Sequence, residues 1–151
     1  MKPFTTSLPN LDQLSLTESP DFIEELARDA LIQLSGQAVE NQALILLLHL
    51  AKSYTAQEKI DCAEQVLRDM RERLNKSSLQ VQLRYLTEVT RLFLEKGNTS
   101  EAQAVWNKAK KLCSHVQDSY AETELAKLIL CLSPTEKHSR EAAQQALELA
   151  A

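Results

Sequence analysis

Two segments of this 151-residue chain carry the same apolar pattern at a constant shift of 39 positions, from 54 to 93 and from 63 to 102. Seven pairs of residues correspond in this alignment: Leu47 and Leu86, Leu50 and Val89, Ala51 and Thr90, Tyr54 and Phe93, Ala63 and Ala102, Leu67 and Trp106, Met70 and Ala109. Within each copy the apolar residues recur at helical spacing. A repeat of this length is typical of helical solenoids, whose units bury their apolar faces against their neighbours. The pattern therefore predicts an all-α fold, an α-solenoid of antiparallel helical hairpins.

Composition agrees with an all-α protein and excludes several functional classes. The chain has only two glycines and four prolines, which leaves little material for hairpin turns or phosphate-binding loops. Its net charge of −4 gives no long-range attraction for nucleic acid or anionic lipid. The first residues lack the apolar core of a signal peptide, and the longest apolar run, 43–50, is too short to cross a bilayer. We therefore expect no nucleic-acid or membrane partner.

The three cysteines, Cys62, Cys113 and Cys131, are widely spaced and lie within helical patterns. An odd number of cysteines in such positions suits small apolar core residues in a reducing compartment better than a disulfide framework. This favours the cytoplasm.

The chain divides into a polar arm and a helical domain. Residues 1–18 contain two prolines and lack helical periodicity, so we expect a flexible N-terminal arm. Residues 19–151 form the repeat domain. About seven helices are expected there, at about 20–34, 37–54, 55–74, 77–96, 99–115, 119–132 and 133–151. Capping boxes predict helix starts at Thr55, Ser77 and Ser119, and Ser19 before Pro20 predicts the first.

The aligned positions resemble the tetratricopeptide repeat (TPR). The copy at 83–116 matches most of the TPR consensus, through Leu86, Val89, Phe93, Gly97, Ala102, Trp106 and Ala109, and departs from it at Thr90 and in lacking the closing proline. The copy at 44–76 matches at Ala51, Tyr54 and Ala63, whereas Met70 replaces a small residue and Glu58 stands where glycine is usual. A degenerate third copy is placed at 120–151.

The resemblance implies a concave groove lined by the first helix of each repeat. The groove positions carried over from the family are Leu48, Lys52, Arg84, Thr87, Arg91, Leu94, Glu124 and Lys127. Four of these eight are basic, so the groove would favour a peptide that bears carboxylates or phosphate beside an apolar anchor. The alternative is that these are ordinary solvated helix charges. Glu88 and Glu124 would repel a C-terminal carboxylate, which disfavours the heat-shock co-chaperone role of some TPR domains.

No catalytic residue, metal site or cofactor is expected. His49, His115 and His138 lie on separate predicted helices without metal-ligand spacing, and no nucleophile motif or glycine-rich phosphate loop is present.

The sequence indicates a protein-interaction module, an adaptor or scaffold that holds a segment of a partner protein in the groove. Two alternatives stay open. One is a structural subunit that uses the ends of its solenoid, with self-association through the last helix. The other is a small cytoplasmic chaperone for a secreted or assembling protein.

Overall fold

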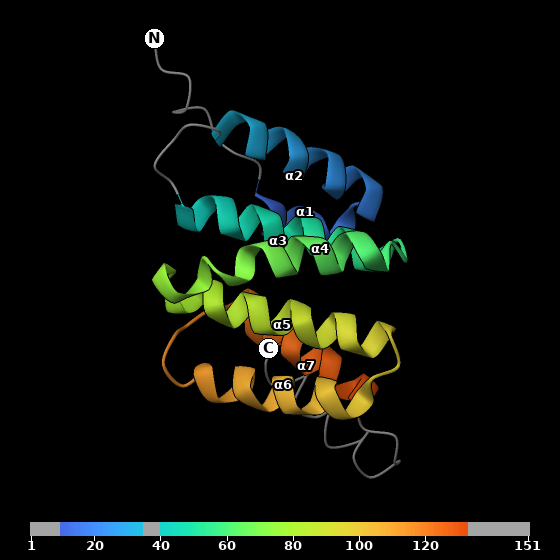
Figure 1. Ribbon diagram of the computed structural model, residues 1–151, viewed down its shortest axis with the longest axis vertical. Coiled ribbons are helices and arrows are strands. Elements are labelled where there is room, and N and C mark those ends of the chain that lie inside the picture. Colours follow the sequence, from blue (N-terminus) through green and yellow to red (C-terminus); the bar gives the residue numbers. More distant parts are fainter. Residues whose placement is uncertain (1–9, 35–39, 133–151) are drawn as a thin grey trace. The chain divides into compact units, whose positions relative to one another are not determined.

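The computed structural model describes residues 10–34 and 40–132, and all the regular secondary structure in these ranges is helical (Figure 1). The elements are α1 (Leu11–Thr17), α2 (Pro20–Leu34), α3 (Glu40–Ala56), α4 (Ile60–Arg71), a single 3₁₀ turn η1 (Leu74–Lys76), α5 (Leu79–Glu95), α6 (Thr99–Leu112) and α7 (Ser119–Leu132). The all-α class is thus confirmed. The helix expected at about 133–151, and with it most of the third repeat, lies outside the described residues.

The chain separates into two compact units, Met1–Ser77 and Ser78–Ala151. In the first unit, α3 packs against both α2 and α4, and α1 packs on α2 and α3. In the second unit, α5 packs against α6, and α7 packs against both of them. The repeats at 44–76 and 83–116 therefore lie in different units, and each forms a helical hairpin within its unit.

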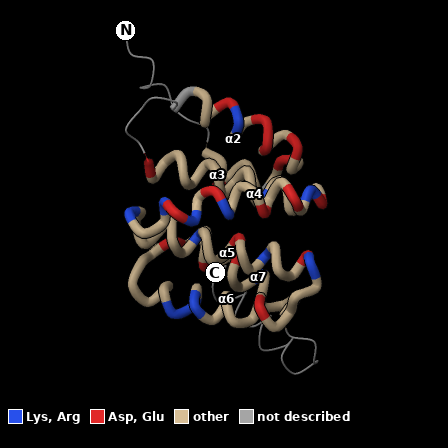
Figure 2. The backbone as a smooth tube through the Cα atoms, in the orientation of Figure 1, with Lys and Arg blue, Asp and Glu red and all other residues tan. Residues whose placement is uncertain are grey.

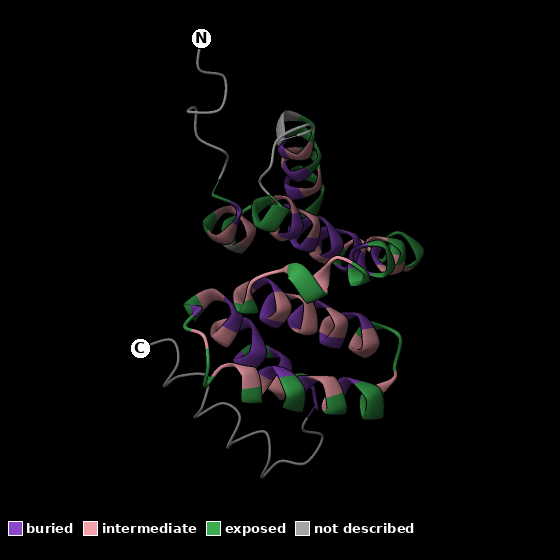
Figure 3. Ribbon diagram, turned by 60° about the vertical axis from the view of Figure 1, so that its left-hand side comes forward, coloured by how far each residue is buried: buried purple, intermediate pink, exposed green. Residues whose placement is uncertain are grey.

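The two hairpins bury equivalent positions. Four pairs of residues related by the 39-residue shift are essentially fully buried: Leu44 and Leu83, Ala51 and Thr90, Ala63 and Ala102, Met70 and Ala109. Most of these are small, and small residues let two helix backbones approach closely where they cross. The exposed residues of α4 and α6 lie opposite their buried ones (Figure 3). The apolar repeat is therefore a pattern of helix packing.

The turn between α3 and α4 is a Schellman motif. The amide of Lys59 donates to the carbonyl oxygen of Tyr54 at 2.8 Å, and the amide of Glu58 donates to that of Thr55 at 3.1 Å. Glu58 takes the left-handed conformation that this motif requires, with φ of 62°.

The turn between α5 and α6 repeats this geometry. The amide of Asn98 donates to the carbonyl oxygen of Phe93 at 2.8 Å, and the amide of Gly97 donates to that of Leu94 at 3.1 Å. Gly97 has φ of 80°. Every donor and acceptor is shifted by 39 positions from its counterpart in the first turn, so the repeat extends to individual backbone hydrogen bonds.

All three predicted capping boxes are wrong in position. Thr55 lies inside α3, where its hydroxyl donates to the carbonyl oxygen of Ala51 at 3.0 Å, because α3 continues to Ala56, two residues beyond its expected end, before the left-handed Glu58. The start of α5 is capped by Ser78, whose hydroxyl accepts from the amide of Val81 at 3.2 Å. Ser77 instead donates its hydroxyl to the carbonyl oxygen of Leu74.

At the start of α7 the capping residue is Asp118, one position before the expected Ser119. Its Oδ1 accepts from the amide of Ala121 at 3.2 Å. A carboxylate also interacts favourably with the positive end of the helix dipole, which a serine cannot do.

Residues 11–17 differ from the expected arm. They form α1, whose N-cap Asn10 accepts from the amide of Gln13 and whose Leu11 is only 3% exposed. A seven-residue helix has too little periodicity to be recognised from its sequence, and packing on α2 and α3 stabilises it. Residues 1–9 lie outside the described residues.

The cysteines also differ from expectation, since Cys62 and Cys131 are exposed and Cys113 is half-buried. None of the helices in the described ranges has the length and apolar character needed to cross a membrane.

Candidate partner-binding surface

The eight groove positions fall on three helices. In the first unit, Leu48 is buried within α3 and Lys52 is half-buried on the same helix. In the second unit, α5 supplies Arg84, Thr87, Arg91 and Leu94, and α7 supplies Glu124 and Lys127. Thr87 is buried and donates its hydroxyl to the carbonyl oxygen of Leu83 at 2.9 Å. Leu94 packs against the core of this unit.

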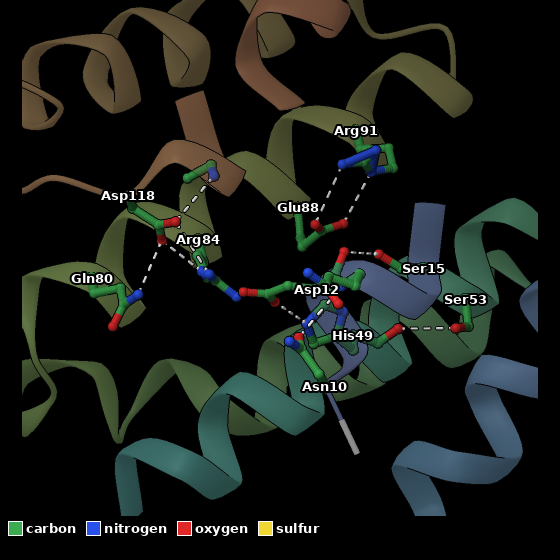
Figure 4. A network of polar contacts seen from close by, with 12 residues as sticks. Asn10, Asp12, Ser15, His49, Ser53, Gln80, Arg84, Glu88, Arg91 and Asp118 are labelled. Atoms are coloured by element: carbon green, nitrogen blue, oxygen red, sulfur yellow. Dashed lines mark hydrogen bonds and ion pairs between the residues drawn. The ribbon is translucent and has the colours of Figure 1, made fainter. Parts of the chain in front are cut away.

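Arg84 forms a buried, two-pronged ion pair with Asp118. Its Nε lies 2.6 Å from Oδ2 and its Nη2 lies 3.1 Å from Oδ1 of the carboxylate (Figure 4). The two side chains are 7% and 3% exposed. The guanidinium also lies over the ring of Tyr120, 4.7 Å from its centroid, and Gln80 donates to Asp118 at 3.3 Å. One carboxylate thus caps α7 and binds α5.

Arg91 links the same two helices through a second ion pair. Its Nη2 lies 2.7 Å from Oε1 of Glu124 on α7, and its Nε lies 3.1 Å from Oε1 of Glu88 on α5. Burial disfavours a charged guanidinium, but the negative charges of Glu88 and Glu124 outweigh this and raise the pKa of Arg91. Lys127 approaches the other oxygen of Glu124 at 3.4 Å and is itself 56% exposed.

The groove hypothesis assumed that four basic side chains could bind a ligand. Two of them instead form ion pairs inside the second unit. Arg84 is matched by Asp118, which caps α7, and Arg91 by Glu124 within α7. Sequence reasoning missed Asp118 altogether. It treated Glu124 as a repulsive group for a ligand, whereas the structure pairs it with Arg91. Of the four basic residues, Lys127 is exposed, Lys52 and Arg91 are half-buried, and Arg84 is buried.

In the first unit, a polar contact connects α1 to α3. Nε2 of His49 lies 2.8 Å from Oδ1 of Asp12, and the imidazole is 4% exposed (Figure 4). Beside this contact is a small pocket, lined by Ser15 and Glu18 on the α1 side, Ile23 of α2, and Lys52, Ser53 and Ala56 of α3. One predicted groove residue, Lys52, therefore lines a pocket under α1.

Glu24 of α2 contacts the turn between α3 and α4. Its Oε1 accepts from Gln57 at 2.9 Å and from Lys59 at 3.2 Å, and Arg28 approaches Oε2 at 3.0 Å. Burial alone would raise the pKa of Glu24, but these hydrogen bonds and the charges of Lys59 and Arg28 hold it below its ordinary value. The acidic residues of α2 and the basic C-terminal half of α6 are visible in Figure 2.

Within the described ranges, no group of three or more histidine, cysteine, aspartate or glutamate residues is placed to hold a metal ion. His115 is exposed, and His138 lies outside these ranges. Burial, reinforced by the charge of Glu122, raises the pKa of the Cys113 thiol, which lowers its thiolate fraction.

No protein-family model, no curated protein and no solved structure matches this chain.

Proposed function

We propose that this protein is a TPR-like interaction module that binds a segment of a partner protein. The observation that carries the proposal is the repeated hairpin, in which two helix pairs share both their buried positions and their turn hydrogen bonds at a shift of 39 residues. Helical repeats of this kind have helix faces that do not pack against the rest of the protein, and repeat proteins use such faces to bind partners.

The packing of α7 gives further support. This helix contacts both α5 and α6, as the first helix of a following repeat would. Trp106 of α6 is 9% exposed, and its indole Nε1 donates to the carbonyl oxygen of Leu125 in α7 at 2.9 Å. Solenoids are built from such contacts between successive hairpins.

The proposed groove is less basic than its sequence suggests. The charges of Arg84 and Arg91 are compensated by Asp118, Glu88 and Glu124. Substitution of Lys52 in the first unit and of the exposed Lys127 in the second tests the attraction of an acidic partner segment. The partner proposed is another protein, with neither nucleic acid nor membrane involved. The site of action proposed is the cytoplasm, in keeping with three cysteines that form no disulfide.

Affinity capture of the intact chain from its native cell extract tests the proposal, with a Lys52→Gln/Lys127→Gln variant beside it. These substitutions remove charge without breaking the Arg84 or Arg91 ion pairs. A Lys108→Gln/Lys111→Gln variant is the matched control, because both lysines are exposed on α6. We expect a defined protein partner that is retained by the control and lost with the Lys52/Lys127 variant. Absence of any reproducible partner would contradict the proposal.

Assembly through an outer helical face is the second candidate. Ile32 on α2 is 72% exposed, which is unusual for a residue of its size, and Phe22 on the same helix is 41% exposed. If the captured partner is lost with Ile32→Ser but kept with the Lys52/Lys127 variant, the binding surface is α2 and the protein acts as a subunit of an assembly.

A further inference from the structure

The N-terminal helix α1 is short and packs on α2 and α3. Seven residues are too few to form a stable helix in water, because nucleation costs more than so short a helix recovers. Its helical state therefore depends on the surface beneath it, which is formed by α2 and α3. Leu11 is the only described α1 side chain classed as buried.

The surface beneath α1 contains a buried histidine that hydrogen-bonds to α1. His49 is 4% exposed on α3, and its Nε2 meets the carboxylate of Asp12, in the first turn of α1, at 2.8 Å. A buried imidazole needs a hydrogen-bond partner, and here α1 supplies one. We call the surface lined by Ile23, His49, Ser53 and Ala56 the helix-binding surface.

The fit between α1 and the helix-binding surface is incomplete. The small pocket described above lies where Ser15 and Glu18 face Ile23, Ser53 and Ala56. Side chains that line a void lose packing contacts on that side, so α1 gains less from this surface than a larger apolar side chain at the same place would. A helix with a bulkier residue at the position of Ser15 would fill the pocket.

We propose that the helix-binding surface recognises a short amphipathic helix of a partner protein, and that α1 occupies it as an internal mimic until the partner displaces it. The recognised segment carries a leucine followed by an aspartate in its first turn, as Leu11 and Asp12 do, and a larger apolar residue four positions after the leucine. The inference deepens the proposed function and rests on it, since it names the class of segment that one surface binds.

Displacement requires that α1 open independently of the helices beneath it. The amides of Leu14 and Glu18, which donate to Asn10 and Leu14, report on this opening by hydrogen exchange in the full chain. We expect them to exchange about 100-fold faster than the slowest amides of α3, because local opening needs less free energy than global unfolding. Equal protection of α1 and α3 would overturn the proposal.

Binding in trans is tested with a capped peptide that has the sequence of residues 10–18 and leucine in place of Ser15. The unaltered chain is compared with a Leu11→Ala/Asp12→Asn chain, in which α1 competes less well for the surface. We expect the peptide to bind the variant about tenfold more tightly than the unaltered chain, because the binding-competent fraction rises. A peptide with alanine in place of Asp12 should bind about tenfold less tightly, because it has no acceptor for the hydrogen bond to the buried His49.

Two controls keep this test decisive. The single variant Asp12→Asn replaces the double variant if the latter unfolds, and Asp29→Asn, an exposed position on α2, controls for loss of charge. Equal affinity of the peptide for the altered and unaltered chains, or no effect of the peptide's aspartate, would overturn the proposal. The capture experiment with the Lys52/Lys127 variant does not depend on this result. Failure of the peptide test would therefore contradict this inference and leave the proposed function standing.

Discussion

The turns of the two hairpins have the same backbone geometry but different residues at the position that matters most. The first turn places Glu58 in the left-handed region, and the second places Gly97 there. A side chain in this region is strained, whereas glycine is not. The comparison teaches that the packing of the helices on either side of the turn imposes the left-handed conformation. It does so even at Glu58, whose side chain disfavours that conformation.

The largest expected effect compares equivalent core positions of the two hairpins. Trp106→Ala should lower the free energy of unfolding by about 3–5 kcal/mol, and Leu67→Ala, at the matching position, by about 2–5 kcal/mol. Trp106 should give the larger loss, because its indole also hydrogen-bonds Leu125. Urea denaturation measures both. A loss below about 1 kcal/mol for either variant would show that its side chain is not part of a packed core.

A buried ion pair in the second unit joins Arg84 of α5 to Asp118 at the start of α7. Arg84→Met leaves the buried Asp118 carboxylate uncompensated and should cost about 3–5 kcal/mol. In the double variant Arg84→Met/Asp118→Ser, the serine keeps a cap for α7 and no buried charge remains. We expect this variant to recover most of the lost stability in urea denaturation, and no recovery would contradict the assignment of the loss to an uncompensated buried charge.

The turn residues themselves provide a matched pair. Gly97→Ala should lower the free energy of unfolding by about 1 kcal/mol, and Glu58→Gly should raise it by a similar amount, because a residue with a Cβ is strained at positive φ. A Cβ at Gly97 would meet no atom within 4 Å, so backbone strain alone sets the loss. Thermal unfolding of both variants measures the effect. Changes of the same sign would contradict the equivalence of the two turns.

The smallest expected effect is a pH dependence confined to the first hairpin. The pKa of Glu24 is lowered in the folded state, so its contribution to stability is present above its ordinary value of 4.5 and is lost as the pH falls through the folded value. Lys59, its partner at the turn, aligns with Asn98 in the second hairpin. Since Lys59 and Arg28 are about half exposed, Glu24→Gln should reduce the acid-dependent loss of stability by only about 0.2–1 kcal/mol. Unfolding curves at pH 3 to 7 would show this, and an unchanged pH profile would exclude a role for Glu24.

The sequence predicted the helical class, the repeat and most of the buried positions because these depend on periodicity over many residues. Ala63 and Ala102 are fully buried, as their alignment required. Helix ends were less predictable, since they depend on single residues. Asp118 and Ser78 each start a helix through one capping hydrogen bond, and Glu58 ends one through its positive φ. In each case a neighbouring residue could have served almost as well, so the sequence alone did not identify the boundary.

The candidate surface was less predictable than the fold. Arg84 and Arg91 are charged residues on a helix, and their sequence does not tell whether they face solvent or a carboxylate on another helix. Pairing with Asp118 and Glu124 depends on how α7 packs against α5. The short helix α1 and its contact with His49 could not be predicted from the sequence either, because both arise from tertiary packing.

The equivalence of the two hairpins is tested most directly by nuclear magnetic resonance of the intact chain, through backbone dihedral angles and couplings across hydrogen bonds. We expect positive φ at Glu58 and Gly97 and detectable couplings from the amides of Lys59 and Asn98 to the carbonyl groups of Tyr54 and Phe93. Negative φ at Glu58, with α4 beginning directly after Thr55, would show that the first turn is built differently and that the repeat does not extend to the backbone.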